Sequence, residues 1–104
     1  MSRLKDFTTI LDEELRDPEF AREYLATLLE ENDLEAFLIG LGDVVRVQGG
    51  MSQIAQRAEI GRESLYKSLS GQRNPQIKTV NSVLGALGMQ LTIRCQTPDI
   101  SRAA

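Results

Sequence analysis

Residues 50–71, GMSQIAQRAEIGRESLYKSLSG, predict two short helices joined by a tight turn. The inward face of the first helix consists of Met51, Ile54, Ala55 and Ala58. In the second helix, Leu65 and Leu69 are one turn apart and face inward, and Gly71 is a typical left-handed stop. This pattern is that of a helix-turn-helix, which places its second helix in the major groove of DNA.

Other helices are predicted on both sides of this segment. Apolar residues recur at helical spacing over about 4–16, 18–31 and 34–47 before it, and over about 77–87 after it. Asp17-Pro18 and Asp33 carry the capping chemistry of helix starts. Gly40 and Gly42 lie inside the third helix, where each costs about 1 kcal/mol relative to alanine.

The segment 89–96 departs from this helical pattern. Apolar and polar residues alternate there over all eight positions, which predicts a half-buried strand. A lone strand leaves its backbone groups unpaired, so it needs a partner: residues 6–10, a second copy, or another protein. We favour a second copy, because helix-turn-helix proteins bind half-sites about 34 Å apart as two-fold dimers. The predicted dimer residues are Met89, Leu91 and Ile93, with Leu91 and Ile93 facing the core.

Charge is divided unevenly along the chain. Residues 1–45 carry a net charge of −8 and residues 46–95 a net charge of +5, within an overall charge of −3. Such asymmetry indicates that the basic half contacts nucleic acid. The alternative is that solvated helix faces happen to segregate by charge.

Composition argues against several classes of protein. One cysteine excludes an internal disulfide, and no run of about 18 apolar residues or apolar signal core is present, so we expect a cytoplasmic protein without a membrane partner. The chain has no histidine and no phosphate-binding loop, and Cys95 is expected to pack in an apolar run. We therefore expect no enzyme, no cofactor and no metal; the acidic residues Asp12, Glu13, Glu14, Asp17 and Glu19 form a solvated helix face.

The outer face of the second short helix supplies most candidates for DNA contact. Arg62 can present a bidentate fork to guanine, Glu63 can accept from cytosine N4, and Ser64 can serve either base. Lys67 and Arg73 are placed for phosphates, as are backbone N–H groups near Ser52. The candidate set is Ser52, Gln53, Arg62, Glu63, Ser64, Tyr66, Lys67 and Arg73. For each of them the alternative is an ordinary solvated position.

The run from 51 to 93 resembles the helix-turn-helix domain of the phage-repressor (Xre-like) class, and more closely the HigA-type antidote proteins of RelE-like addiction modules. The resemblance covers about 18–95, with Glu59 at a turn position that is often glycine and Met51 in place of a phosphate-binding glutamine. The residues that carry it are Tyr24-Leu25, Leu41-Gly42-Asp43-Val44, Met51-Ser52-Gln53, Arg62-Glu63-Ser64-Leu65-Tyr66, Leu69-Ser70-Gly71, Asn74-Pro75, Leu84 and Ala86-Leu87-Gly88.

The resemblance implies an antitoxin that represses its own operon as a homodimer and neutralises a small basic toxin of the RelE/HigB type. The expected fold is all-α: a five-helix repressor-like domain with an N-terminal helical extension and one C-terminal β-strand. The expected organisation is an acidic segment at 1–17, the DNA-binding domain with its strand at 18–96, and a disordered tail at 97–104. The rivals are a prophage-type repressor without a toxin partner and an interaction module that does not bind DNA.

Overall fold

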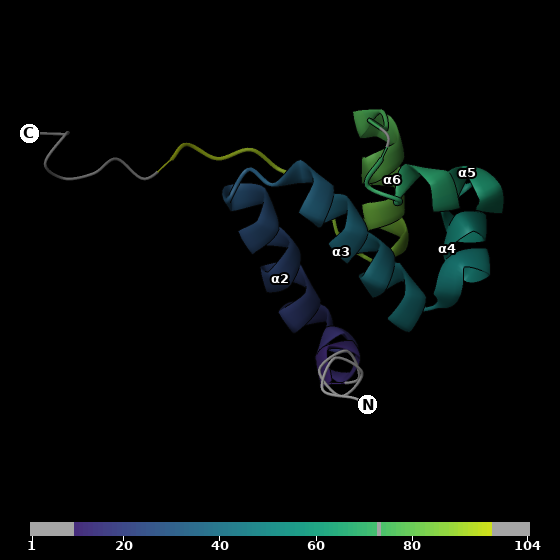
Figure 1. The fold of residues 1–104 in the computed structure, drawn as a ribbon, viewed down its shortest axis with the longest axis horizontal. Helices are drawn as coiled ribbons and strands as arrows, with labels where there is room; N and C mark the ends of the chain where they lie inside the picture. Colours follow the sequence, from purple (N-terminus) through teal and green to yellow (C-terminus); the bar gives the residue numbers. More distant parts are fainter. Residues whose placement is uncertain (1–9, 73, 97–104) are drawn as a thin grey trace, which may run out of the picture.

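The computed structural model describes residues 10–72 and 74–96 and is helical (Figure 1). Residues 10–15 are helical, and five further helices follow: α2 (Pro18–Glu30), α3 (Leu34–Val47), α4 (Gly50–Ala58), α5 (Arg62–Ser68) and α6 (Ile77–Ala86). The predicted all-α class is therefore confirmed for the part of the chain that the structure describes. Among those residues, no helix has the length and apolar character needed to cross a membrane.

Two aspartates begin the helices of the acidic half, as predicted. The Asp17 carboxylate accepts a hydrogen bond from the backbone N–H of Glu19 at 3.0 Å, with Pro18 in the first turn of α2. The Asp33 carboxylate accepts from the backbone N–H of Ala36 at 3.1 Å. Each aspartate satisfies a donor that has no partner inside the helix, which fixes where α2 and α3 start.

The connection between α4 and α5 is a tight turn with a left-handed residue. Glu59 has φ 61° and ψ 41°, and the backbone N–H of Ile60 donates to Ala55 O at 3.0 Å. A non-glycine residue in this conformation costs about 1 kcal/mol, which the surrounding packing must offset. Helix α5 ends at Ser68, and Gly71, predicted as a left-handed stop, has a positive φ of 83°.

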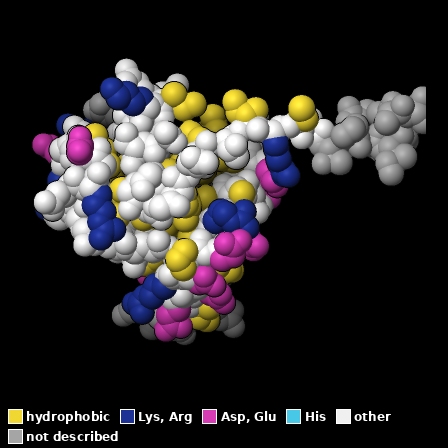
Figure 2. Space-filling view, turned by 180° about the vertical axis from the view of Figure 1, so that it is seen from behind, with side chains coloured by type: hydrophobic (Ala, Val, Ile, Leu, Met, Phe, Trp, Pro, Cys, Tyr) yellow, Lys and Arg dark blue, Asp and Glu magenta, His cyan; other side chains and the backbone are white. Residues whose placement is uncertain are grey.

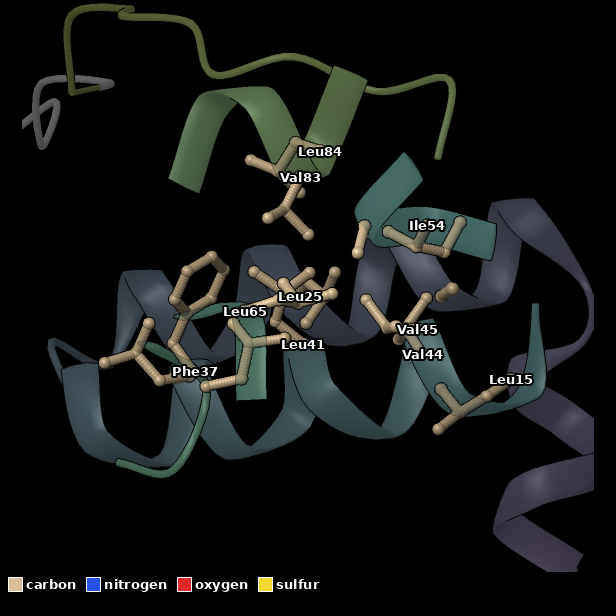
Figure 3. Packing of buried hydrophobic residues seen from close by; sticks show 14 residues of the cluster. Leu15, Leu25, Phe37, Leu41, Val44, Val45, Ile54, Leu65, Val83 and Leu84 are labelled. Carbon is tan, nitrogen blue, oxygen red and sulfur yellow. The ribbon is translucent and has the colours of Figure 1, made fainter. Parts of the chain in front are cut away.

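The hydrophobic core lies between α3 and the helices on either side of it (Figure 3). Leu41, Val44 and Val45 of α3 are fully buried at its centre, and Val83 of α6 approaches them from the opposite side. The fully buried Leu65 fixes α5 on this core, as Ile54 fixes α4. Burying a leucine or isoleucine side chain contributes about 1.5–3 kcal/mol, so these contacts set the position of the α4–α5 pair.

A glycine lets α2 and α3 cross closely. A Cβ atom added to Gly40 would lie 3.0 Å from side-chain carbons of both Leu28 and Tyr24 on α2. Contacts this short are tighter than most real Cβ contacts, so with a larger residue here the side chains of Leu28 and Tyr24 would have to shift. This contact explains a glycine inside α3 that helix propensity alone disfavours.

The helical stretch 10–15 is bound to the end of α3. Leu15 is fully buried in the common core, and the Gln48 side chain donates to Leu15 O at 2.8 Å. The guanidinium of Arg46 donates to both carboxylate oxygens of Asp12, at 2.9 and 3.0 Å. Of the helix predicted over 4–16, residues 10–15 are helical and residue 16 forms a turn; residues 1–9 lie outside the described part.

The predicted strand at 89–96 is not present among the described residues. The segment runs in an extended course (Figure 1), but it pairs with no strand among residues 10–72 and 74–96. Of the partner considered at 6–10, residue 10 is helical, and residues 6–9 lie outside the described part. Leu91 packs against the core, whereas Ile93, which we expected to face it, is 97% exposed. The alternation of apolar and polar residues predicted an extended backbone, but a β-strand also requires a second strand with which to form backbone hydrogen bonds.

Cys95 is a second correction. We expected it to pack in an apolar run, but its side chain is exposed. The reason is that the chain leaves the body of the protein after Leu91, so that the residues from 92 to 96 are all exposed. The predicted disordered tail, 97–104, lies outside the described residues.

Candidate nucleic-acid interface

Helix α5 presents the predicted polar face to solvent. Its inner side is held by Leu65 and, just beyond its end, by Leu69, both buried. Its outer residues Arg62, Glu63, Ser64, Tyr66 and Lys67 are all exposed, and four of them, all except Ser64, line one shallow hollow. Five of the eight predicted residues thus lie together on one short helix.

An ion pair joins two of these side chains across one turn of α5. Lys67 Nζ lies 3.9 Å from a carboxylate oxygen of Glu63, and both side chains are more than half exposed. A solvent-exposed pair of this kind contributes at most about 1 kcal/mol. Breaking this ion pair so that Lys67 can bind an anion such as a phosphate therefore requires little free energy.

The start of α4 carries the predicted Ser52 and Gln53, both exposed. The side-chain amide of Gln53 has one orientation in which both its nitrogen and its oxygen form a hydrogen bond. In this orientation the nitrogen donates to Gly49 O at 3.3 Å, and the oxygen accepts from Arg57 Nη2 at 3.2 Å. This contact adds Arg57 to the candidate residues. The sequence contained the signal, because a residue four positions after Gln53 lies on the same helix face.

Helix starts differ between the two halves of the protein. Helices α2 and α3 are capped by aspartates, whereas the cap residues of α4 and α6, Gly49 and Gln76, make no side-chain cap hydrogen bond. The first N–H groups of α4, at Gly50 and Met51, therefore receive no carboxylate from their cap residue. Arg73, predicted to contact phosphate from the connection between α5 and α6, lies outside the described residues.

An acidic surface lies at the end of the protein away from α5, around residues 10–15 and α2 (Figure 2). There Arg46 bridges Asp12 and Asp43, with the Asp43 contact at 3.2 Å. The hydrogen bonds from Arg46 lower the pKa of Asp12, with partial burial opposing them and the positive charges of Arg46 and Arg16 adding to the effect. The same bonds raise the pKa of Arg46 above its ordinary value. The bridge thus holds the acidic N-terminal stretch against α3.

The bridge predicts a pH-dependent contribution to stability. We expect Asp12→Asn to lower the free energy of unfolding at pH 7 by roughly 0.5–1 kcal/mol, because the pair is partly exposed. The folded-state pKa of Asp12 is lowered, so its contribution is complete above the unfolded value of about 3.9 and is lost as pH falls through the folded value. Urea unfolding at pH 7, 5 and 3 measures this difference.

The matched control is Glu14→Gln, which neutralises an exposed carboxylate on the same helical stretch. It should leave the free energy of unfolding within about 0.5 kcal/mol of the wild type. A difference between wild type and Asp12→Asn that persists unchanged at pH 3 would contradict the assignment of the bridge.

No group of three or more His, Cys, Asp or Glu side chains within 10–72 and 74–96 is arranged to hold a metal ion.

Comparison with known proteins identifies the family. Residues 4–95 match the family model described as "Probable addiction module antidote protein". The chain belongs to this family of addiction module antidotes. It is also 44% identical over 92 residues to an uncharacterized protein of Haemophilus influenzae, an alignment that spans 88% of this chain and 92% of the relative. No solved structure gives a significant match.

Family membership confirms the coarser part of the sequence interpretation. An antidote acts by binding, so the family is not one of enzymes, and its role implies a toxin as partner.

Proposed function

We propose that this antidote represses its own operon by binding operator DNA through α4 and α5. One observation carries the proposal: buried Leu65 holds α5 on the core so that its polar and basic side faces solvent. A helix presented in this way fits the major groove, which is wide enough to admit it. Bound there, the protein blocks transcription by occlusion.

The roles of the residues follow from their chemistry. Arg62 reads guanine through O6 and N7, Glu63 accepts from cytosine N4, and Ser64 serves either base. Lys67 and Arg73 neutralise phosphates. The start of α4 contributes backbone N–H groups near Ser52, together with the side chains of Gln53 and Arg57, to contacts with the adjacent phosphates. The ring of Tyr66 packs beside the sugar-phosphate backbone of the DNA.

A homodimer fits this function best. A single α5 helix reads only a few base pairs, and two half-sites together give useful affinity. The extended segment 89–96 pairs with no strand among the described residues, and its Met89 and Leu91 are packed against the core. We place the dimer contact on Met89, Leu91 and Ile93, as a two-stranded antiparallel ribbon.

The toxin, in this proposal, is a small basic protein of the RelE/HigB type that docks on the acidic half. The family supports a toxin partner, and residues 1–45 carry a net charge of −8. Complementary charge accelerates encounter, and exposed apolar side chains such as Ile10 supply anchors. The family match favours this role over that of a prophage-type repressor without a toxin.

Substitution of Lys67 tests the DNA-binding role. Lys67→Ala should weaken binding to operator and scrambled DNA by similar factors and lower the salt slope of log affinity by about one per subunit, since one phosphate contact is lost. Titrations of both DNAs at several salt concentrations measure these slopes.

The control for this experiment is Lys78→Ala, which removes an exposed lysine from α6. It should change the slope less than Lys67→Ala, because we place no contact there. Equal salt slopes of log affinity for the wild type and Lys67→Ala would show that α5 does not contact the DNA phosphates through Lys67.

A further inference from the structure

A shallow groove of about 150 Å³ lies at the turn between α2 and α3, at the end of α2 away from residues 10–15 (Figure 1). Every residue of its lining except Asn74 is apolar. Two of them, Phe37 and Leu38, are buried and belong to the core, whereas Leu29 and Leu34 are 37% and 55% exposed. The groove therefore leaves two large leucine side chains open to contact with another molecule.

Backbone hydrogen bonds fix the turn that holds these leucines. Asn32 has φ 60°, and its backbone N–H donates to Leu29 O at 2.9 Å. The backbone N–H of Asp33 donates to Leu28 O at 3.2 Å, and the Asp33 carboxylate caps α3. Because these bonds end α2 and begin α3, Leu29 and Leu34 are held in place before any partner binds, which lowers the entropy cost of binding.

Acidic side chains flank the groove. Residues 28–38 include four acidic residues and neither lysine nor arginine. Glu30 already forms an ion pair within the chain, so the charge that faces a partner is that of Glu31, Asp33 and Glu35, all exposed. An apolar groove with an acidic rim complements a partner that presents an apolar side chain beside lysine or arginine.

This charge distinguishes between kinds of partner. The acidic rim repels the phosphates of DNA and of an anionic membrane surface. A second copy bound through the same face would bring two acidic surfaces together, since residues 1–45 carry a net charge of −8. The family implies a toxin as protein partner, and the basic toxin of the proposed function has the complementary charge.

We propose that the groove at the α2–α3 turn takes an apolar side chain of the basic toxin, with cationic side chains of the toxin against the acidic rim. The inference rests on the toxin docking of the proposed function and specifies where the toxin is anchored. Helix α2 has 13 residues and is about 20 Å long, so one small protein lying along it reaches both the groove and residues 10–15. Residues 10–15 then steer the encounter, and the groove slows dissociation.

The dissociation rate of the complex tests the anchor. The probe is the purified basic product of the adjacent gene, bound to the full-length antidote. Leu34→Gln should speed dissociation by about 10-fold or more, because a polar amide replaces an apolar anchor. Ile39→Gln is the matched control: it is 46% exposed on the same helix, does not line the groove, and should leave the rate close to that of the wild type. Both positions are exposed, so thermal unfolding should change little.

Reversal of one rim charge tests the electrostatic contact. Glu31→Lys should slow association several-fold at low salt and less at high salt, because repulsion replaces attraction. The substitution should preserve the fold, since Glu31 lies at the C-terminus of α2, where a positive charge is favourable. An unchanged association rate at low salt would exclude the rim from the contact.

A thiol in the groove reports its occupant directly. Cys95 is the one cysteine of the chain, so Leu34→Cys in a Cys95→Ser background carries a single thiol. Saturating toxin should slow alkylation of this thiol several-fold, because the bound side chain covers it. Ile39→Cys in the same background should react at an unchanged rate.

The possible results separate the groove from the docking itself. A stable complex in which Leu34→Cys reacts as fast as in the free antidote overturns the groove and leaves toxin docking elsewhere on the acidic half. Absence of any complex overturns both. Protection of Leu34→Cys without toxin, increasing with the concentration of the chain, assigns the groove to a second copy and overturns the toxin as its occupant.

Discussion

Arg62→Ala is expected to weaken operator binding by about 1–3 kcal/mol, or roughly 5- to 150-fold, and to relax the preference for one base pair in each half-site. Arg62 is exposed at the first position of α5, and Leu65, one turn later, is fully buried and fixes the direction of the helix. A guanidinium held in this way can donate two hydrogen bonds to guanine, which alanine cannot replace. Binding to a set of operators with single base changes measures the loss.

Arg22→Ala is the matched control for this prediction. It removes the same charge from an exposed helix position in the acidic half, where Arg22 pairs with Glu19 and Glu23. Operator affinity should change little, and base preference should not change at all. If Arg62→Ala keeps the full base preference of the wild type, Arg62 does not read the DNA.

The double variant Glu13→Lys/Glu14→Lys is expected to slow association with the toxin by about 10-fold or more, because it replaces attraction by repulsion at the docking surface. Both glutamates are exposed on the helical stretch 10–15, so the substitutions should preserve the fold. Association with the basic product of the adjacent gene, measured by biolayer interferometry at low and moderate salt, gives the rates. The difference should shrink as salt increases.

Point substitutions are preferable here to deletion of residues 1–17. Leu15 is fully buried, and Gln48 donates to its carbonyl oxygen, so the deletion would remove part of the core together with the docking surface. Glu59→Lys is the control, since it reverses an exposed charge in the basic half. An association rate that falls equally in the control and in the double variant would contradict docking on the acidic stretch.

Local chemistry allowed much of this fold to be predicted from sequence. Asp17 and Asp33 begin helices where their side chains satisfy backbone donors, and Glu59 takes the left-handed conformation that the turn requires. The spacing of the apolar residues predicted the bounds of α3, and Leu65 points into the core as the helical period of α5 indicates. These features depend on residues a few positions apart, whose relation a helix or a turn determines.

Features that depend on distant residues could not be predicted. The bridge between Asp12 and Arg46 joins positions 34 apart, and the close approach of Gly40 to Tyr24 depends on how two helices cross. The segment 89–96 shows the same limit: its alternation indicated an extended chain facing the core, but Ile93 is exposed because no part of residues 10–72 and 74–96 packs over it. For the candidate site, the period of α5 predicted which side chains face outward, whereas the contact between Gln53 and Arg57 was missed.

The central claim is that α4 and α5 bind a specific operator. The most direct measurement is the affinity of the full chain for the DNA upstream of its own gene, against a scrambled sequence of the same length, at several salt concentrations. Our account predicts tighter binding to the upstream DNA by about 10³-fold or more, with log affinity falling steeply and linearly with log salt. Equal, weak and salt-insensitive binding to both DNAs would contradict it and would leave an antidote that acts on its partner alone.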